Sequence, residues 1–314
     1  MQIIHNSDSG FIQTSTAITI GKFEALHQGH SQLIKSTLAY AKSYSNFNAH
    51  SLASAVLSFV PHPAQVLSDR EYKPLFTEEE QAFLLRKYGI DYWILYPFDK
   101  NTAQLTPKAF CQLLQTHFDC KALLVGEDFH FGRNREGNPE ALRIIGQALG
   151  IDIVTIPYHR IDGEEKVSTS QIRDYLSKGQ VKEANELLGR PFLIMGTIQK
   201  GRQLGRTIGF PTANIQPASH KFLPPDGVYA TKIIIGEIKK SGVTNIGTNP
   251  TVADGQRRRV ETHIFDFDGD IYGKEIIVEL FALIRPERTF SGIEALKRQI
   301  AADALEARTL CCYR

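Results

Sequence analysis

The chain has 314 residues, which is enough for two domains of ordinary size. Hydrophobic residues make up 42% of it and charged residues 22%, so each half can bury a core. Lys and Arg number 36 against 34 Asp and Glu, and the resulting net charge of +2 gives no sign of a surface built for nucleic acid.

The cysteine content and the first residues of the chain indicate the cellular compartment in which the protein works. The four cysteines, Cys111, Cys120, Cys311 and Cys312, form no CxxC pair, which argues against a zinc site and is typical of a reducing compartment. The first ten residues are polar, unlike a signal peptide, and no run of about 18 apolar residues could span a membrane. We therefore expect a cytoplasmic protein that acts on small molecules, without a membrane or nucleic-acid partner; its oligomeric state is not indicated.

Residues 1–186 alternate short apolar runs with helical patterns and are predicted to form the first domain. Buried strands are predicted at Ala17–Ile20, Ala53–Phe59, Tyr92–Tyr96, Ala122–Val125 and Ile151–Ile156. Helix starts are marked by a capping box (Thr77, Glu80) and by the capped prolines Thr106-Pro107 and Asn138-Pro139, and Gly150 marks a helix end. This alternation predicts an α/β doubly wound, Rossmann-like sheet, which binds ligands beyond the carboxyl ends of its strands.

A histidine pair follows the first predicted strand. His27 and His30 are one helical turn apart at the start of a predicted helix, and Gly29 between them lets a phosphate approach the backbone. Two imidazoles at a helix N-terminus suit a reaction that builds negative charge on an α-phosphate. The alternative is a pair of surface histidines, and the position after a strand of a doubly wound sheet favours the functional interpretation.

A second helix start lies at Val167–Arg173. Ser168 supplies an N-cap hydroxyl and Arg173 a guanidinium in the first turn, which could bind the phosphates of ATP or the departing pyrophosphate. Serine is also a preferred N-cap in any helix, so the segment alone favours an ordinary capped helix.

Together these two segments resemble the HxGH nucleotidylyltransferase superfamily. The motifs Ser58–Pro63 and Val125–Gly137 narrow this to a resemblance, over about residues 16–191, to the flavin adenylyltransferase module of prokaryotic bifunctional FAD synthetases, although Lys22–Ala25 stands where that family usually has Asn-Phe-Asp-Gly. The resemblance implies catalytic roles for His27 and His30, contacts to ATP from Gly21, Phe23, Gly29, Ser168 and Arg173, and contacts to FMN from Pro61, Asp128, Phe129 and Phe131. Phe129 and Phe131 suit stacking on a flavin or adenine, but either could equally be a core residue.

From about Leu193 the pattern changes, and residues 187–314 are predicted to form the second domain. Strands are predicted at Leu193–Ile198, Val228–Ile235, Val260–Phe267 and Ile276–Ile284, separated by Gly, Pro and Asn turns. This pattern favours a small antiparallel β-barrel, with a sandwich as the alternative. Ile293, Leu296, Ile300 and Ala304 predict a closing helix whose apolar stripe packs on the barrel.

A glycine-rich stretch, Gly196–Asn214, opens this half. It lacks the GxxxxGK[ST] pattern of a P-loop, and the polar Arg202, Gln203 and Arg206 exclude a membrane helix with small residues at every fourth position. Glycines in a polar loop between strands suggest a close approach of backbone N–H groups to phosphate. A flexible hairpin loop is the alternative.

The same stretch resembles riboflavin kinase, whose signature runs from this loop into Pro211–Asn214, and later segments match in order to about residue 308. The resemblance implies Mg²⁺ bound by Thr212 and Asn214, and Glu261 as the base that takes the proton of the riboflavin 5′-hydroxyl. It further implies ATP contacts from Gly201, Gly205, Arg206, Gly209, Pro211, Thr212 and Asn214, and flavin contacts from Arg285 and Phe290. Without the resemblance, Glu261 would be interpreted as an acid on a strand surface.

The motifs together predict a bifunctional enzyme that phosphorylates riboflavin to FMN and adenylylates FMN to FAD, with ATP as co-substrate and release of pyrophosphate. One alternative is a nucleotidylyltransferase for another phosphorylated substrate, and intact Thr212, Asn214 and Glu261 argue against it. The other is a non-catalytic flavin sensor, and retained His27 and His30 argue against that.

Overall fold

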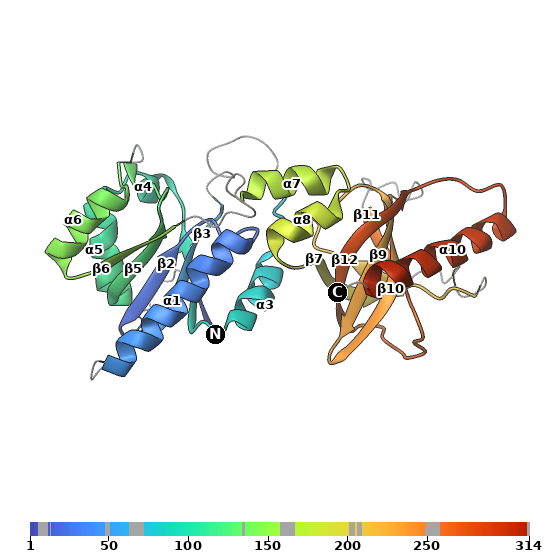
Figure 1. Ribbon diagram of the computed structural model, residues 1–314, viewed down its shortest axis with the longest axis horizontal. Helices are drawn as coiled ribbons and strands as arrows, with labels where there is room; N and C mark the ends of the chain where they lie inside the picture. The colour runs from blue at the N-terminus through green and yellow to red at the C-terminus, as the bar shows by residue number, and fades with distance from the viewer. Residues whose placement is uncertain are drawn as a thin grey trace. The chain divides into compact units, whose positions relative to one another are not determined.

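The computed structural model describes residues 1–5, 12, 14–47, 51–62, 72–133, 136–157, 167–200, 205, 209–248 and 258–312 (Figure 1). The chain divides into two compact units, Met1–Tyr72 with Gln81–Val167 and Lys73–Glu80 with Ser168–Arg314. The short segment Lys73–Glu80 thus belongs to the second unit although first-unit residues flank it in the sequence. A functional boundary between residues 186 and 187 stays a prediction.

The first unit is built on a parallel sheet of six strands in the order β1-β4-β3-β2-β5-β6. The strands are β1 (Gln2–His5), β2 (Thr16–Ile20), β3 (Ala53–Val60), β4 (Tyr92–Pro97), β5 (Cys120–Gly126) and β6 (Asp152–Ile156). The predicted doubly wound fold is confirmed. Strand β1 was not predicted, so Thr16–Ile20 is the second strand of the chain.

Helices cover this sheet, and the sequence signals for their ends are confirmed. They are α1 (Gln28–Phe47), α3 (Glu78–Tyr88), α4 (Lys100–Ala103), α5 (Pro107–Phe118) and α6 (Pro139–Leu149). Thr106 accepts a hydrogen bond from the Ala109 N–H at 3.2 Å, and Asn138 accepts one from Ala141 at 2.8 Å. Among the described residues, no helix has both the length and the apolar character needed to cross a membrane.

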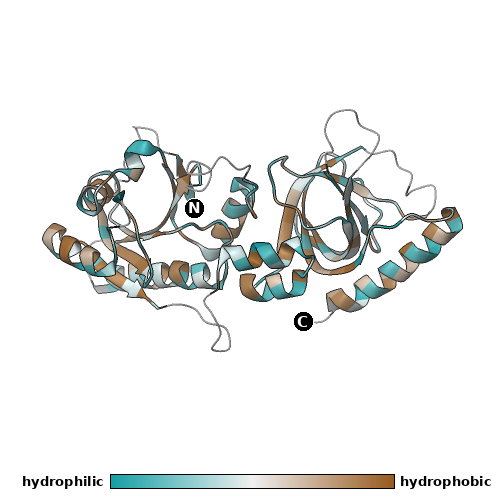
Figure 2. Ribbon diagram, turned by 90° about the horizontal axis from the view of Figure 1, so that it is seen from above, coloured by the Kyte–Doolittle hydropathy of each residue, from teal (hydrophilic) through white to brown (hydrophobic). Residues whose placement is uncertain are grey.

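The core of the first unit lies on both faces of the sheet because neighbouring strand residues point to opposite sides. Ile18 and Leu123 pack on one face with Phe110 and Leu114 of α5. On the other face lies a second cluster, Ala17, Ala122, Leu124 and Leu52 with Ala41 of α1. Figure 2 shows the strands mostly in brown and the helices in both colours, as expected for buried strands and amphipathic helices.

The second unit is an antiparallel barrel, as predicted; the barrel is closed, and its strand order is β10-β11-β8-β7-β12-β9. The strands are β7 (Phe192–Gln199), β8 (Ala213–Gln216), β9 (Gly227–Ile235), β10 (Ile238–Thr248), β11 (Arg258–Ile264) and β12 (Glu275–Pro286). Helices α7 (Thr169–Ser177) and α8 (Val181–Leu188) precede the barrel, and α10 (Ile293–Cys312) follows it. The predicted strand Val260–Phe267 ends early, at Ile264, because Asp266 adopts a left-handed backbone conformation with φ of 52°.

A chain of hydroxyl groups crosses three strands inside the barrel. Thr244 lies 2.9 Å from both Thr231 and Thr262, and all three side chains are fully buried. Each hydroxyl can donate and accept, so the buried polar groups satisfy one another. Because these threonines point inward, their strand neighbours Asn245 and Glu261 point to the outside of the barrel.

Helix α10 packs on the outside of β9 and β10. Ala307 and Cys311 form a cluster with Val228, Ala230 and Val243. The predicted stripe is wrong at its start, since Ile293 is 61% exposed and the contact instead involves the C-terminal half of the helix. Near that end Arg308 donates to both carboxylate oxygens of Asp266, which lowers the pKa of that carboxyl.

A buried ion pair joins Lys73–Glu80 to the barrel within the second unit. The Lys221 ammonium lies 2.5 Å from a carboxylate oxygen of Glu80, and both side chains are fully buried. Lys221 also donates to the Leu75 carbonyl at 2.7 Å, while the other Glu80 oxygen accepts the Met195 N–H at 2.8 Å. Burial lowers the pKa of Lys221, and the Glu80 carboxylate opposes that shift.

The same Glu80 completes the predicted capping box at the start of α3. The Thr77 N–H donates to the Glu80 carboxylate at 2.9 Å, and the Glu80 N–H donates to the Thr77 hydroxyl at 3.3 Å. One side chain therefore both begins a helix and anchors the segment to the barrel.

Candidate active sites

The first candidate site lies at the carboxyl edge of the parallel sheet. Strand β2 lies between β3 and β5, and the chain runs from β2 to β3 on one side and returns later to β5 on the other. This is the point where the direction of winding reverses, and doubly wound sheets bind ligands there. The segments Gly21–His27 and Glu127–Gly132 follow the two strands that meet at this point.

The two histidines are brought together, as the one-turn spacing predicts. Their rings stack with centroids 3.8 Å apart and planes 17° apart. His27 is the N-cap of α1, because its Nδ1 accepts the backbone N–H of His30 at 3.4 Å. A ring nitrogen that accepts a hydrogen bond carries no proton, so with this contact the neutral form of His27 has its proton on Nε2.

Phe23 packs against this histidine pair, and Gly21 packs against Phe23. The Phe23 ring is 1% exposed, and its centroid lies 5.0 Å from that of His30. A Cβ on Gly21 would come within 3.2 Å of the same ring, so the glycine permits the close packing. Gly29 is the second residue of α1, where backbone N–H groups lie outside the helical hydrogen-bond pattern. Phe23 thus packs against a catalytic candidate and is itself a buried residue.

The aromatic pair after β5 divides into two kinds of residue. Phe131 is 9% exposed and belongs to the core, where its ring packs on Phe110 at 5.2 Å. Phe129 stacks on it at 5.3 Å and is only partly buried, so it is the better placed of the two to meet a ligand. Asp128 is exposed at the same turn, and Pro61 follows β3 through a cis peptide bond.

Ser168 and Arg173 lie in the second unit, on α7. Ser168 caps the helix by accepting the Gln171 N–H at 3.2 Å. Arg173 donates to the Lys73 carbonyl at 2.8 Å, and its guanidinium lies 5.2 Å from the centre of the Phe222 ring. Their predicted contacts to ATP phosphates stay predictions.

The second candidate site is a row of residues across the outside of the barrel. The strand register pairs Asn214 with Glu261, Glu261 with Asn245, Asn245 with Val228, and Val228 with Arg285. Directly paired residues of antiparallel strands project from the same face with Cβ atoms about 4.5–5.5 Å apart. Three residues far apart in the sequence, the predicted metal ligand Asn214, the predicted base Glu261 and the predicted flavin contact Arg285, therefore share one line.

Gly205 and Phe210 lie beside Thr212, next to this row. The Phe210 N–H donates to the Gly205 carbonyl at 2.8 Å, and a Cβ on Gly205 would collide with the Phe210 carbonyl oxygen. Gly209 has φ of 86°, a conformation that favours glycine. His263, two residues after Glu261, contacts the Pro211 carbonyl at 2.8 Å through its ring nitrogen. Gly201 and Arg206, which were predicted to bind ATP, lie outside the described residues.

The oxygen ligands that Thr212 and Asn214 offer fit magnesium. Thr212 and Asn214 offer a hydroxyl and an amide oxygen, with the Glu261 carboxylate next to Asn214 in register. Among the described residues, no group of three or more His, Cys, Asp and Glu side chains could hold a metal ion. The oxygen set at Thr212 and Asn214 is compatible with the predicted ion.

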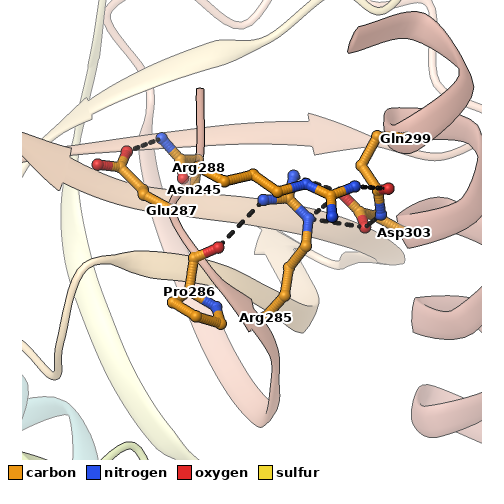
Figure 3. Close-up of polar contacts among 7 residues, drawn as sticks. All are labelled: Asn245, Arg285, Pro286, Glu287, Arg288, Gln299 and Asp303. Atoms are coloured by element: carbon orange, nitrogen blue, oxygen red, sulfur yellow. Dashed lines mark hydrogen bonds and ion pairs between the residues drawn. The ribbon is translucent and has the colours of Figure 1, made fainter. Parts of the chain in front are cut away.

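Arg285 lies at the far end of the row and connects β12 to α10 (Figure 3). Its guanidinium donates to both oxygens of Asp303, at 2.8–3.1 Å, and the Asp303 side chain is 2% exposed. Phe290 lies under two cations, 5.5 Å from the Arg285 guanidinium and 5.0 Å from that of Arg288. The structure therefore shows Arg285 fixing a helix beside the predicted flavin contact Phe290.

Sequence reasoning gave no role to one neighbour of this row. Glu287 follows β12 and accepts a hydrogen bond from the Asn245 side chain at 3.0 Å (Figure 3). Nothing local marks this contact, because the two residues are 42 positions apart. Only the barrel register brings them together.

Comparison with known proteins gives a match for each unit. A riboflavin kinase family model matches residues 188–311, and an FAD synthetase family model matches residues 11–171. The bifunctional riboflavin kinase/FMN adenylyltransferase of Escherichia coli (strain K12) is 37% identical over 308 residues, which cover 97% of this chain and 95% of the relative. The protein of the same description from Bacillus subtilis (strain 168) is 34% identical over 301 residues, covering 94% and 92%.

A solved structure matches the whole chain. A crystal structure described as a macrolide-efflux protein from Streptococcus pneumoniae aligns with a TM-score of 0.86 and 27% identity, covering 99% of both chains. That description concerns the S. pneumoniae protein. The family models and the curated relatives confirm the resemblance drawn from the two sets of motifs, and this chain belongs to the family of bifunctional riboflavin kinase/FMN adenylyltransferases.

Proposed function

We propose that the two units perform two successive ATP-dependent reactions on one flavin. The barrel transfers the γ-phosphoryl group of ATP to the 5′-hydroxyl of riboflavin and yields FMN. The parallel-sheet unit joins the phosphate of FMN to the α-phosphate of a second ATP, which yields FAD and releases pyrophosphate. The observation that supports the proposal is the presence of two separate sets of candidate phosphate-binding residues in one chain of this family.

In the kinase site, Glu261 is the proposed base. Its carboxylate can accept a hydrogen bond from the riboflavin hydroxyl, orient that oxygen toward the γ-phosphorus and take its proton as the new bond forms. Thr212 and Asn214 would hold Mg²⁺, which when bound neutralises the charge of the ATP phosphates. The backbone at Gly205 and Gly209 would approach those phosphates closely.

In the adenylyltransferase site, His27 and His30 are the proposed catalytic residues. The Nε2–H of His27 can donate to an oxygen of the α-phosphate, where negative charge builds as the FMN phosphate attacks. The N-terminal end of α1, where Gly29 is the second residue, adds partial positive charge at the same place. We further propose that Phe129 contacts the flavin or adenine ring, and that Ser168 and Arg173 bind the leaving pyrophosphate.

The decisive experiment supplies the purified chain with riboflavin, ATP and Mg²⁺ and separates the flavins by chromatography. FMN should form first and FAD later, and supplied FMN should yield FAD without riboflavin. A chelator should stop FMN formation, and excess Mg²⁺ should restore it. If neither riboflavin nor FMN is converted with Mg²⁺ present, the proposal is wrong; if only one of them is converted, the unit assigned to the other lacks its role. The cytoplasmic location and the absence of nucleic-acid partners remain predictions.

A further inference from the structure

The Glu287 carboxylate is held against the outer face of β10. A Cβ on Gly247 would overlap the Glu287 carboxylate, so the glycine leaves room for this close approach. There Glu287 Oε1 accepts a hydrogen bond from Asn245 Nδ2 at 3.0 Å (Figure 3). Gly247 and Asn245 are two residues apart on one strand and project from the same face. The carboxylate therefore fixes the amide group of Asn245 from one side.

Glu261 lies on the other side of that amide. Asn245 and Glu261 are directly paired between β10 and β11, which places their Cβ atoms about 4.5–5.5 Å apart on the outer face. An amide group has two N–H donors and one oxygen acceptor, and Glu287 uses one of the donors. The second donor and the oxygen border the position at which the riboflavin hydroxyl would meet Glu261.

We propose that Glu287 and Asn245 are positioning residues of the kinase site. Glu287 sets the orientation of the Asn245 amide, and Asn245 in turn sets the orientation of the Glu261 carboxylate and the acceptor hydroxyl. This proposal rests on the proposed role of Glu261. The Glu287 carboxylate, which follows β12, lies against Gly247 of β10, on the same outer face as the predicted base Glu261. The proposed role explains this arrangement.

The role requires a hydrogen-bond acceptor at position 287 and not a charge. Other charged or titratable groups lie along the row: Arg259 and His263 flank Glu261 along the outer face of β11, and Arg285 lies at the far end of the row. Glu287→Gln keeps an acceptor oxygen for Asn245 and removes only the charge, whereas Glu287→Ala removes both. The two variants therefore separate positioning from electrostatics.

The test measures kcat and KM for FMN formation in the variants Glu287→Gln, Glu287→Ala and Asn245→Ala. Both alanine variants should lower kcat by about 10–100-fold, the size typical for residues that orient an active-site group, with little change in KM. Glu287→Gln should recover most of the activity. The double alanine variant should be no slower than either single variant, because the two residues act as one unit.

Three results would overturn the proposal: unchanged kcat in the alanine variants, a Gln variant as slow as the Ala variant, or losses that multiply in the double variant. Glu275 is an exposed acid at the start of β12, the strand that Glu287 follows. Glu275→Ala is the matched control and should leave kcat unchanged. FMN formation by the unsubstituted chain and its loss in Glu261→Gln are measured in the same series. A failure there would count against the proposed function, whereas a failure confined to positions 245 and 287 would count against this inference alone.

Discussion

The two units position their proposed site residues by different means. In the first unit the residues lie on loops and on the first turn of a helix, so their places depend on caps and on buried support such as Phe23. In the second unit three of the kinase-site residues, Asn214, Glu261 and Arg285, lie within strands, and the barrel register aligns them. A site whose residues are aligned by strand pairing is fixed by many backbone hydrogen bonds, whereas a site at a helix start depends on a few local contacts.

The largest effect expected from this comparison is a separation of the two activities. Glu261→Gln should lower FMN formation by about 10²–10⁴-fold, the usual contribution of a general base, and leave the conversion of supplied FMN to FAD unchanged. His30→Ala should show the reverse pattern, with FAD formation reduced by about 10²–10³-fold through loss of a donor to the developing charge. Rates on each substrate supplied separately check both. Loss of both activities in either variant would contradict two independent sites.

A smaller but still large effect concerns the buried anchor of the second unit. Glu80→Ala leaves the Lys221 charge buried without its partner and should destabilise the second unit by about 3–5 kcal/mol. Calorimetry of the whole chain measures this loss, while the fluorescence of Trp93, the single tryptophan, follows the first unit.

Two further variants separate the ion pair from the helix start. Glu79→Ala, in the same first turn but exposed, should cost at most about 0.3–1 kcal/mol. Replacing both partners by apolar residues, Glu80→Leu with Lys221→Met, should recover much of the stability because no buried charge remains. Equal losses in Glu80→Ala and Glu79→Ala would show that the buried pair contributes nothing.

The smallest effect tests the helix start of the first unit. His27→Ala removes both the cap of α1 and the Nε2–H donor, whereas His27→Asn keeps a side chain able to cap. Both variants should lose FAD formation, but His27→Ala should be less stable than His27→Asn by about 1 kcal/mol. Urea unfolding followed by Trp93 fluorescence measures the difference. Equal stabilities would mean that the 3.4 Å contact is not a cap.

The parts of the fold that could be predicted are those with a local cause. Buried strands such as Ala53–Val60 are mostly apolar runs, and the caps at Thr106 and Asn138 are each marked by the proline that follows. Strand β1 was missed because it is a half-exposed edge strand of four residues. Strand β10 was missed because small and polar residues, among them Thr244, form its buried section.

The residues of the candidate sites could likewise be predicted only where a local signal or a family resemblance marks them. The His27 and His30 pair could be recognised because its spacing is one helical turn, and Thr212, Asn214 and Glu261 because they resemble a known family. The contact between Asn245 and Glu287 and the pair of Glu80 with Lys221 could not, because 42 and 141 residues separate their partners. No periodicity or cap signals such a contact, which exists only once the strands have paired.

The segment Lys73–Glu80 has a consequence for how this protein can be divided. The backbone passes between the two units three times, after residues 72, 80 and 167, so a single cut cannot release both intact. A fragment that begins at residue 187 would carry Lys221 into its interior with neither Glu80 nor the Leu75 carbonyl to receive it. Exchanging halves between relatives would succeed only if residues 73–80 were transferred together with the barrel to which Glu80 is anchored.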